Sequence, residues 1–326
     1  MITVVGPNTA IDRSIDVGAL RPGEVQRATA VRVRPGGKGL HVAQTVAALG
    51  EPVRLVGLDD AAHATLLAAH LNARGVDWQP VRAPHALRQC LALHEADGRI
   101  TEILETGDAV PDPVQQELID RVASLLGSSS ALVLSGSLPA GFPADTYATW
   151  VRAARARNVP CLVDASGGPL KLAVRAGPWL VKPNVDEAGT LAGRRVAGVD
   201  DALECARTLQ RAGVICPVVT LGAAGAVSVE GDAAWRAWAE GVRLRNGVGS
   251  GDCFLAAMAV AAVRGESLEA SLQLAVACGA ANAENEETGF AERDQIHAWV
   301  PRVRLERLRP PSTLAAPAAR SVARDA

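Results

Sequence analysis

Short apolar runs that alternate with helical patterns most constrain the fold of this chain. The runs occupy residues 131–134, 161–164, 180–182 and 218–221. Helical patterns lie between or after them at residues 147–157, 200–212, 253–263 and 268–283. Continuous apolar runs of strand length are typical of parallel strands that are covered on both faces. The repeated strand–helix units therefore predict an α/β fold with a doubly wound sheet, which binds ligands at the carboxyl ends of its strands.

A second pattern predicts a small sheet apart from this core. Residues 30–34 alternate apolar and charged side chains, as in a sheet with one face in solvent. Residues 90–94 and 99–103 are two further strand-like stretches, and Asp97-Gly98 lies between them. Asp-Gly between two such stretches is a strong hairpin signal. We expect these segments to form one small exposed sheet.

Composition and charge exclude several functional classes. The 326 residues suffice for one large α/β domain or two ordinary ones, and 48% hydrophobic content fits a sizeable core. A formal net charge of −2 and only 3% aromatic residues argue against a nucleic-acid binder. No apolar stretch is long enough to span a bilayer, and no leader pattern follows Met1. The six cysteines lack the close spacing of zinc or redox sites, so we expect a reduced, cytoplasmic protein.

We expect the chemistry at a glycine-rich segment, residues 246–258. Gly247, Gly249 and Gly251 alternate there, and a run suited to a helix begins at once. Glycine permits positive φ and a close approach of the backbone to a ligand. A helix that begins after such a turn directs unpaired N–H groups and the positive end of its dipole at an anion, most often phosphate.

Asp252 stands out because it places a carboxylate at the mouth of this anion site. One interpretation is that Asp252 only caps the helix, which is a common use of aspartate. The other is that Asp252 accepts a proton from an attacking hydroxyl while neighbouring amides hold the developing phosphoryl charge. The second interpretation describes phosphoryl transfer.

Two polar segments near the start of the chain belong with this chemistry. Pro35-Gly-Gly-Lys-Gly39 leads from an exposed strand into a helix and is either a plain glycine turn or an anion site. Lys38 favours the anion site, because a cation at a helix start is unfavourable unless an anion is bound. The segment lacks the Gly-Lys-Ser/Thr ending of a Walker A loop. Asp12, after the first strand, either caps a turn or binds sugar hydroxyls.

Two later segments also follow predicted strands. In residues 182–187, Glu187 would face the same strand ends and could orient water on a magnesium ion. Residues 220–225 end a buried strand with two glycines, which is compatible with close approach to a nucleotide.

Other enzyme classes have no support in the sequence. No G-x-G-x-x-G follows an early strand, as a dinucleotide-binding dehydrogenase would require. The G-x-S-x-G elbow of a hydrolase and the H-E-x-x-H of a zinc protease are absent as well. His63 and His70 are interpreted as solvated helix residues rather than ligands.

Residues 35–48 and 246–257 resemble the two signatures of the PfkB carbohydrate kinase family. The resemblance extends over about residues 1–300 and includes Ser135-Gly-Ser-Leu-Pro139 and Lys182-Pro-Asn184. Within the family it is closest to the branch of 1-phosphofructokinases and tagatose-6-phosphate kinases. The family implies a ribokinase-like fold, with a mostly parallel doubly wound sheet and a small β-sheet lid. It also implies phosphorylation of a sugar or sugar-phosphate alcohol, with ATP and Mg²⁺.

The same resemblance predicts the domain organisation. Residues 1–308 would form one kinase domain, with a lid from about residues 13–35 and 88–106. Residues 309–326, rich in Pro, Ala and Arg, are expected to be a disordered tail. The lid is expected to pair with that of a second subunit, because an exposed sheet edge is a liability unless it is covered. We therefore expect a homodimer that acts on a small sugar phosphate, without nucleic-acid or membrane partners.

The resemblance also implies roles for individual residues. Asp252 resembles the catalytic base, and the anion hole corresponds to Gly249, Ser250 and Gly251. Positions on the sugar-phosphate side are Asp12, Gly36, Gly37, Lys38, His41, Arg88 and Ser137. Positions on the nucleotide and magnesium side are Lys182, Asn184, Glu187, Thr220, Gly222, Gly225 and Asn282. Asn282 would border the adenine, and Glu187 would hold the metal through water.

The departures from the family pattern fall on the sugar side. His41 and Cys90 stand where the branch usually has asparagine, and Leu104 replaces another asparagine. Thr9 stands in for a proline. The transfer segment is intact, so the identity of the sugar is in question rather than the reaction.

The predicted function is ATP-dependent conversion of fructose 1-phosphate to fructose 1,6-bisphosphate. Alternatives are a tagatose-6-phosphate kinase, a 6-phosphofructokinase or another sugar or polyol phosphate kinase. A non-catalytic sensor of sugar phosphates or nucleotides on the same fold is the alternative from another class. The intact Gly-Ser-Gly-Asp segment favours an enzyme, because a sensor does not need the base.

Overall fold

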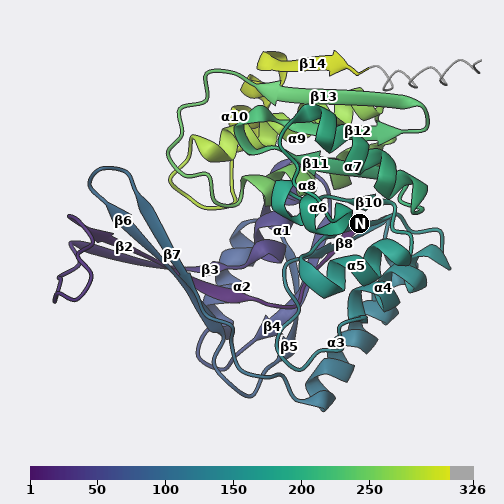
Figure 1. The fold of residues 1–326 in the computed structure, drawn as a ribbon. Helices are drawn as coiled ribbons and strands as arrows, with labels where there is room; N and C mark the ends of the chain where they lie inside the picture. Colours follow the sequence, from purple (N-terminus) through teal and green to yellow (C-terminus); the bar gives the residue numbers. More distant parts are fainter. Residues whose placement is uncertain (309–326) are drawn as a thin grey trace, which may run out of the picture.

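A computed structural model describes residues 1–308, so the predicted disordered tail lies outside the described residues. The strands of the large sheet are β1 (Ile2–Gly6), β4 (Val53–Asp59), β5 (Asp77–Arg82), β8 (Ala131–Ser135), β9 (Cys161–Asp164), β10 (Leu180–Val181), β11 (Cys216–Thr220), β12 (Ala226–Glu230), β13 (Ala233–Ala239) and β14 (Val303–Arg307). They lie in the order β14-β13-β12-β11-β10-β9-β8-β1-β4-β5 (Figure 1). All neighbours from β5 to β11 are parallel, and β12, β13 and β14 add an antiparallel edge. The predicted doubly wound, mostly parallel sheet is confirmed.

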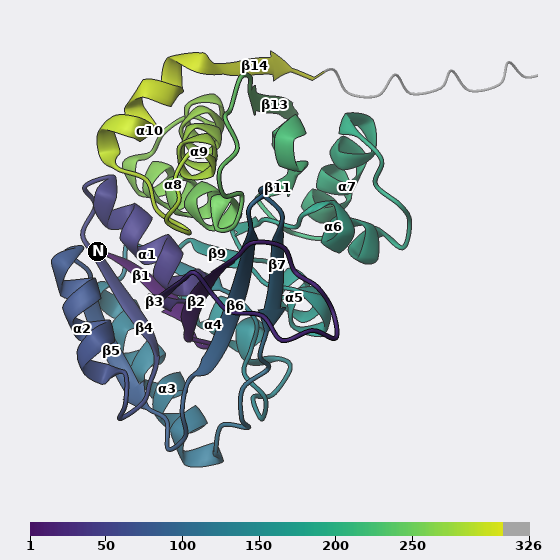
Figure 2. The ribbon, with the colours of Figure 1, turned by 90° about the vertical axis from the view of Figure 1, so that its left-hand side faces the viewer.

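The central strands form because their apolar runs are covered on both faces. Every residue of β1, β8 and β9 is buried, as expected for parallel strands between two helical layers. The helices are α1 (Lys38–Ala48), α2 (Ala64–Ala73), α3 (Asp112–Leu125), α4 (Thr146–Arg155), α5 (Gly167–Arg175), α6 (Val185–Ala192), α7 (Val199–Arg211), α8 (Ser250–Arg264), α9 (Leu268–Ala283) and α10 (Arg293–Trp299). One layer contains α1, α8 and α9, in which α8 packs on both of the others, and the opposite layer contains α3 to α7 (Figure 2).

A second sheet projects from this body (Figure 1). Its strands are β2 (Ala10–Val17), β3 (Ala30–Gly36), β6 (Arg88–Glu95) and β7 (Ile100–Leu104), in the order β3-β2-β6-β7. We call it the small sheet. The hairpin predicted at Asp97-Gly98 joins β6 to β7, and Gly98 has a φ of 87°. Asp12 lies within β2, so of its two predicted roles the structure excludes that of a turn cap.

The apolar core follows this architecture. One large cluster fills both faces of the parallel strands, and a smaller one lies between β11, β12, α6 and α7. Within residues 1–308, no helix is both long and apolar enough to cross a membrane. The fold thus leaves the carboxyl ends of the parallel strands and the base of the small sheet as the place where polar side chains converge.

Candidate active site

A cavity of about 460 Å³ lies where the carboxyl ends of β9, β10 and β11 meet the starts of α1 and α8. The small sheet forms its remaining wall through residues of β2, β6 and β7. The predicted site residues on this wall are Asp12, Gly37, Lys38, His41, Arg88, Ser137, Lys182, Asn184, Thr220, Gly249, Gly251 and Asp252. The fold therefore brings most of the sequence-predicted site together from segments far apart in the chain.

The turn before α8 has the geometry that its glycines predict. Gly249 precedes the helix with a φ of 82°, and a Cβ at this position would overlap the backbone of Gly289. The backbone N–H groups of Asp252 and Cys253 both donate to the carbonyl of Gly249, at 3.0 and 2.9 Å. Gly251, the second residue of α8, belongs to the first turn, whose N–H groups a helix leaves without a partner of its own. The turn can thus present amide donors to a phosphate.

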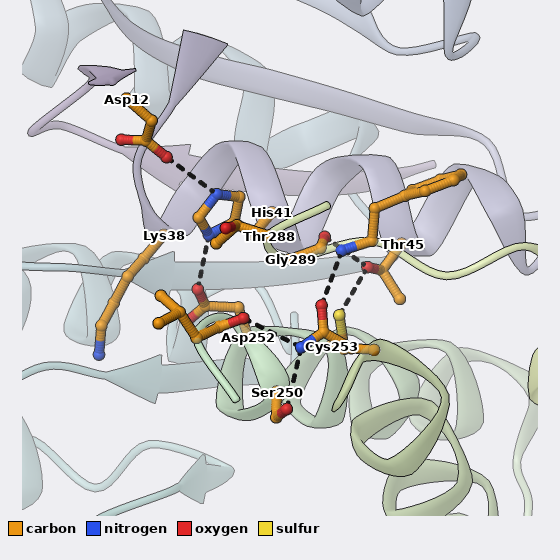
Figure 3. Close-up of polar contacts among 12 residues, drawn as sticks. Asp12, Lys38, His41, Thr45, Ser250, Asp252, Cys253, Thr288 and Gly289 are labelled. Carbon is orange, nitrogen blue, oxygen red and sulfur yellow. Dashed lines mark hydrogen bonds and ion pairs between the residues drawn. The ribbon is translucent and has the colours of Figure 1, made fainter. Parts of the chain in front are cut away.

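Asp252 does not act as the cap of α8, because the start of this helix has no side-chain capping hydrogen bond. Its carboxylate is 4% exposed and meets the His41 ring, with Oδ2 of Asp252 2.9 Å from Nδ1 of His41. On the other side of the ring, Nε2 of His41 lies 3.7 Å from Oδ2 of Asp12 (Figure 3). One imidazole therefore stands between the carboxylates of β2 and α8.

The surroundings of His41 decide its charge. Burial alone would lower the pKa of His41, but the hydrogen bond to Asp252 and the negative charges of Asp12 and Asp252 outweigh burial and raise that pKa to about 9. His41 is therefore an imidazolium ion at neutral pH.

Asp164 is a site residue that the sequence interpretation missed. It ends β9, is 1% exposed, and its Oδ2 lies 3.3 Å from Nζ of Lys182 and 3.5 Å from Nζ of Lys38. Burial would raise the pKa of Asp164, but the two ammonium groups outweigh burial and lower it. The same contact raises the pKa of Lys38. The available signal was the charged end of an otherwise apolar run, Cys161-Leu-Val-Asp164.

Arg88, the first residue of β6, has its guanidinium among carbonyl groups. It donates to the carbonyl of Asn8 at 3.3 and 3.4 Å and to that of Glu105 at 3.3 Å. Within the described part of the chain Arg88 has no carboxylate partner, so its charge is available to an anion. Nearby, Ser137 accepts a hydrogen bond of 2.8 Å from Asn8.

The substituted positions on the sugar side line the same cavity. Cys90 and Leu104 both belong to its wall, on β6 and β7. Burial raises the pKa of the Cys90 thiol to about 11, so this side chain is a neutral thiol. Gly36 lies behind the wall, and a Cβ there would overlap the carboxylate of Asp12. Glycine at this position thus makes room for Asp12.

On the opposite side, Asn184 and Glu187 form a capping box at the start of α6. Oδ1 of Asn184 accepts from the N–H groups of Asp186 and Glu187, at 3.0 and 2.9 Å, and Oε2 of Glu187 accepts from the N–H of Asn184 at 3.0 Å. Asn184 lines the cavity. Glu187 lies behind Asn184 and outside the cavity wall, so its carboxylate has a structural role in addition to the predicted one.

Asn282, predicted on the nucleotide side, lies in the protein interior. Asn282 is fully buried, donates to Ser250 and to the carbonyl of Val248, and accepts from the N–H of Phe290. These hydrogen bonds anchor the Gly249 turn, and the position of Asn282 beside the adenine stays a prediction. Its helix, α9, packs along α8.

The two glycines after β11 differ from each other. A Cβ on Gly225 would overlap the carbonyl of Ala237, so this glycine serves the packing of β13. A Cβ on Gly222 would meet nothing, which leaves the backbone there open to a ligand. Neither glycine lies on the cavity wall of the described structure.

Comparison with known proteins finds similarity over nearly the whole chain. The sequence pattern described as pfkB family carbohydrate kinase matches residues 1–295. A 1-phosphofructokinase of Rhodobacter capsulatus is 35% identical over 281 residues, which cover 85% of this chain and 88% of the relative. A 1-phosphofructokinase of Escherichia coli (strain K12) is 30% identical over 288 residues, which cover 87% and 91%.

The fold is similar to that of solved structures as well. The crystal structure of phosphofructokinase-2 from Escherichia coli in complex with potassium superposes with a TM-score of 0.87 and 28% sequence identity. The match covers 92% of this chain and 98% of that one.

Proposed function

Because the chain belongs to the pfkB family of carbohydrate kinases, we propose that the sugar phosphate on which it acts is fructose 1-phosphate. The protein is a kinase that transfers phosphate to an alcohol group of a sugar phosphate. ATP is the donor that the family implies, and the product would be fructose 1,6-bisphosphate. The observation that carries the proposal is that Asp252, at the start of α8, opens on the same cavity as Lys38 and Arg88.

In the proposed mechanism Asp252 is the general base. The acceptor hydroxyl gives its proton to the Asp252 carboxylate while its oxygen forms a bond to the terminal phosphorus of ATP. The bond from that phosphorus to the bridging oxygen breaks, and the electron pair leaves with ADP. The amides of Gly249, Ser250 and Gly251 hold the charge that develops on the transferred group.

The sugar phosphate would lie against the small sheet. Asp12 would accept hydrogen bonds from sugar hydroxyls, and the backbone of Gly36 and Gly37 would pass close beneath. Lys38 and Arg88 would hold the existing phosphate, for which the guanidinium fork of Arg88 is suited. Support for this assignment comes from the free charge of Arg88 and from its place on the cavity wall.

The nucleotide would lie on the opposite side, near Lys182, Asn184 and Thr220. The open backbone at Gly222 fits close approach of a nucleotide, and Gly225 would lie on the same side while it also serves the packing of β13. In this arrangement the terminal phosphate of ATP would lie between the start of α8 and Lys182. The two are close, since a Cβ on Gly251 would lie 3.4 Å from Nζ of Lys182.

A magnesium ion fits the residues on this side. Among residues 1–308 no group of three His, Cys, Asp or Glu side chains is placed to hold a metal. Magnesium in kinases is held by one or two carboxylates, by water and by the phosphates of the nucleotide. The buried Oδ1 of Asp164 has no hydrogen-bond partner, and together with Glu187 through water it would supply such carboxylates. The ion would neutralise phosphate charge during transfer.

The test is a coupled assay of ADP release over a panel of ketose phosphates. We expect the highest kcat/KM with fructose 1-phosphate. Preference for fructose 6-phosphate or tagatose 6-phosphate would move the protein to one of the alternative specificities. Absence of turnover with any sugar or polyol phosphate would refute the proposed kinase activity and favour a non-catalytic sensor.

We also propose that the protein is a cytoplasmic homodimer that pairs through the small sheet, which would serve as a lid from about residues 13–35 and 88–106. Val31, Val33 and Ile103, on the face of this sheet turned away from the cavity, are 47% to 53% exposed. An apolar sheet surface of this kind is a liability unless covered. The six cysteines are all free thiols, as in a reducing compartment. A protein that stays monomeric at micromolar concentration by light scattering would refute the pairing.

A further inference from the structure

We propose that His41 is a positioning residue for phosphoryl transfer, which as an imidazolium ion fixes the carboxylate of Asp252 and ties it to Asp12 of the small sheet. This inference rests on the proposed function, in which Asp252 is the base. The inference goes beyond the proposed function because it gives a role to His41, the side chain that replaces the asparagine of the family pattern.

The first step of the argument is the geometry of the two ring nitrogens. Nδ1 of His41 lies 2.9 Å from Asp252 and Nε2 lies 3.7 Å from Asp12 (Figure 3). A neutral imidazole carries a hydrogen on only one nitrogen, so its other lone pair would face a carboxylate. Both contacts are favourable only when both nitrogens are protonated.

The second step is that the ring cannot easily turn away. The His41 side chain is 7% exposed, and a Cβ placed on Gly289 would overlap the imidazole. Gln44 and Thr45 of the same helix both donate to the carbonyl of Gly289, which fixes this residue against the ring. The position of the imidazole is therefore set by packing as well as by charge.

The third step is the set of charged groups around the ring. The strand β2 supplies Asp12 and α8 supplies Asp252, and both favour the protonated ring. From α2, His70 approaches, but it pairs with Gln44 at 3.2 Å rather than with His41. The segment after α9 contributes Gly289 and Thr288, neither of which is charged.

Two cations complete this set. Lys38 belongs to the same helix as His41 but is engaged by Asp164. Arg34, at the end of β3, pairs with Glu287 at 3.8 Å. The charged groups that face the His41 ring are thus the carboxylates of Asp12 and Asp252, and both favour its protonated form.

This arrangement has a consequence for the base. Oδ2 of Asp252 accepts a hydrogen bond from His41. The other oxygen, Oδ1, would therefore accept the proton of the acceptor hydroxyl. When His41 loses its proton, one of the two carboxylates faces a lone pair, and the bridge from Asp12 to Asp252 opens. A base that is displaced by as little as about 1 Å can lose on the order of 10² in rate. We therefore expect kcat to fall on the alkaline side as His41 deprotonates.

The main experiment compares the pH dependence of kcat in three proteins with saturating substrates. The wild type should show an alkaline decline centred near the pKa of His41, about 9. His41→Asn, which keeps a hydrogen-bond donor but cannot titrate, should lose this decline and have a neutral-pH kcat lower by roughly tenfold. His63→Asn is the matched control, because His63 pairs with Asp60 at 2.8 Å outside the cavity. It should retain the wild-type profile.

The inference is overturned if His41→Asn keeps the alkaline decline, or if His63→Asn removes it. It is also overturned if His41→Asn raises KM for the sugar phosphate and leaves kcat unchanged, since His41 would then only contact the sugar. Circular dichroism of each variant shows whether a loss of activity is a loss of folding.

A second measurement does not depend on turnover. In nitrogen-15 NMR of the protein without substrates, the His41 ring should titrate well above the ordinary histidine range. Asp252→Asn should lower that pKa by about 1 unit or more, because one of the two opposite charges is gone. A His41 that titrates near 6.5 in the wild type would disprove the bridge even if the kinase is active. Conversely, a high pKa in a protein that phosphorylates no sugar would refute the proposed function and leave the bridge intact.

Discussion

The two sides of the cavity are built in different ways. On the transfer side, Gly249 and Asp252 lie on one turn, and the backbone itself presents the donors. On the sugar side, Asp12, Arg88 and Leu104 come from three different strands of the small sheet. A function that depends on backbone geometry needs a fixed local sequence, whereas side chains on separate strands can be exchanged one at a time. In the proposed assignment, phosphoryl transfer and the choice of sugar therefore depend mainly on different segments, which His41 connects.

The largest effect should come from Asp252→Asn on the transfer side. The change keeps the size of the side chain and removes the proton acceptor, so kcat should fall by roughly 10² or more while KM for ATP stays near its wild-type value. Steady-state kinetics with the preferred sugar phosphate measures this. Asp112→Asn, in the first turn of α3, is the control for an acidic residue at a helix start. Near-normal turnover of Asp252→Asn would show that the transfer side does not supply the catalytic base.

A smaller and different effect is expected from Arg88→Ala on the sugar side. Loss of a charged hydrogen bond costs about 1.5–3 kcal/mol, so KM for the sugar phosphate should rise at least roughly tenfold. KM for ATP should change little. Arg32→Ala, on β3 and paired with Asp16 at 2.7 Å, is the control on the same sheet. An unchanged KM for the sugar phosphate, or equal activity with unphosphorylated sugars, would contradict the phosphate-anchor role.

The third prediction concerns the free energy of unfolding rather than activity. The pKa of His41 is raised from 6.5 to about 9, so the folded state binds this proton more tightly than the unfolded chain. The resulting stabilisation is fully present below pH 6.5 and is lost as pH rises through about 9. Its size is on the order of 1–3 kcal/mol. Urea unfolding at several pH values should show this alkaline loss in the wild type, and a much smaller one in His41→Asn.

The main fold was predictable because its strands are continuous apolar runs between amphipathic helices. The residue pattern did not predict β2, which only the lid implied by the family resemblance covers, from about residue 13. It also missed α5, which begins Gly-Gly-Pro. Local propensity opposes this helix, and the burial of Leu170 and Ala173 against the sheet supplies the stabilisation instead.

The site was predictable where it depends on one short segment. The turn at Gly249, with Asp252 beside it, is local and could be identified from spacing alone. The contacts of Asp164 could not be identified in this way, because its two lysine partners are distant in sequence. The same holds for the contact from His41 to Asp252, which joins residues 211 positions apart. Such pairings follow from the topology of the sheet, and topology is not visible in local patterns.

The buried carboxylate between Lys38 and Lys182 has one further consequence. With no phosphate bound, two ammonium groups at the floor of the cavity would repel each other, and Asp164 acts as their internal counter-ion. Asp164 thus keeps both cations in place, although Lys182 is only 5% exposed and the Lys38 side chain is 48% exposed. An incoming phosphate meets charges that are already oriented. Asp164 consequently prepares the cavity for anions by being an anion itself.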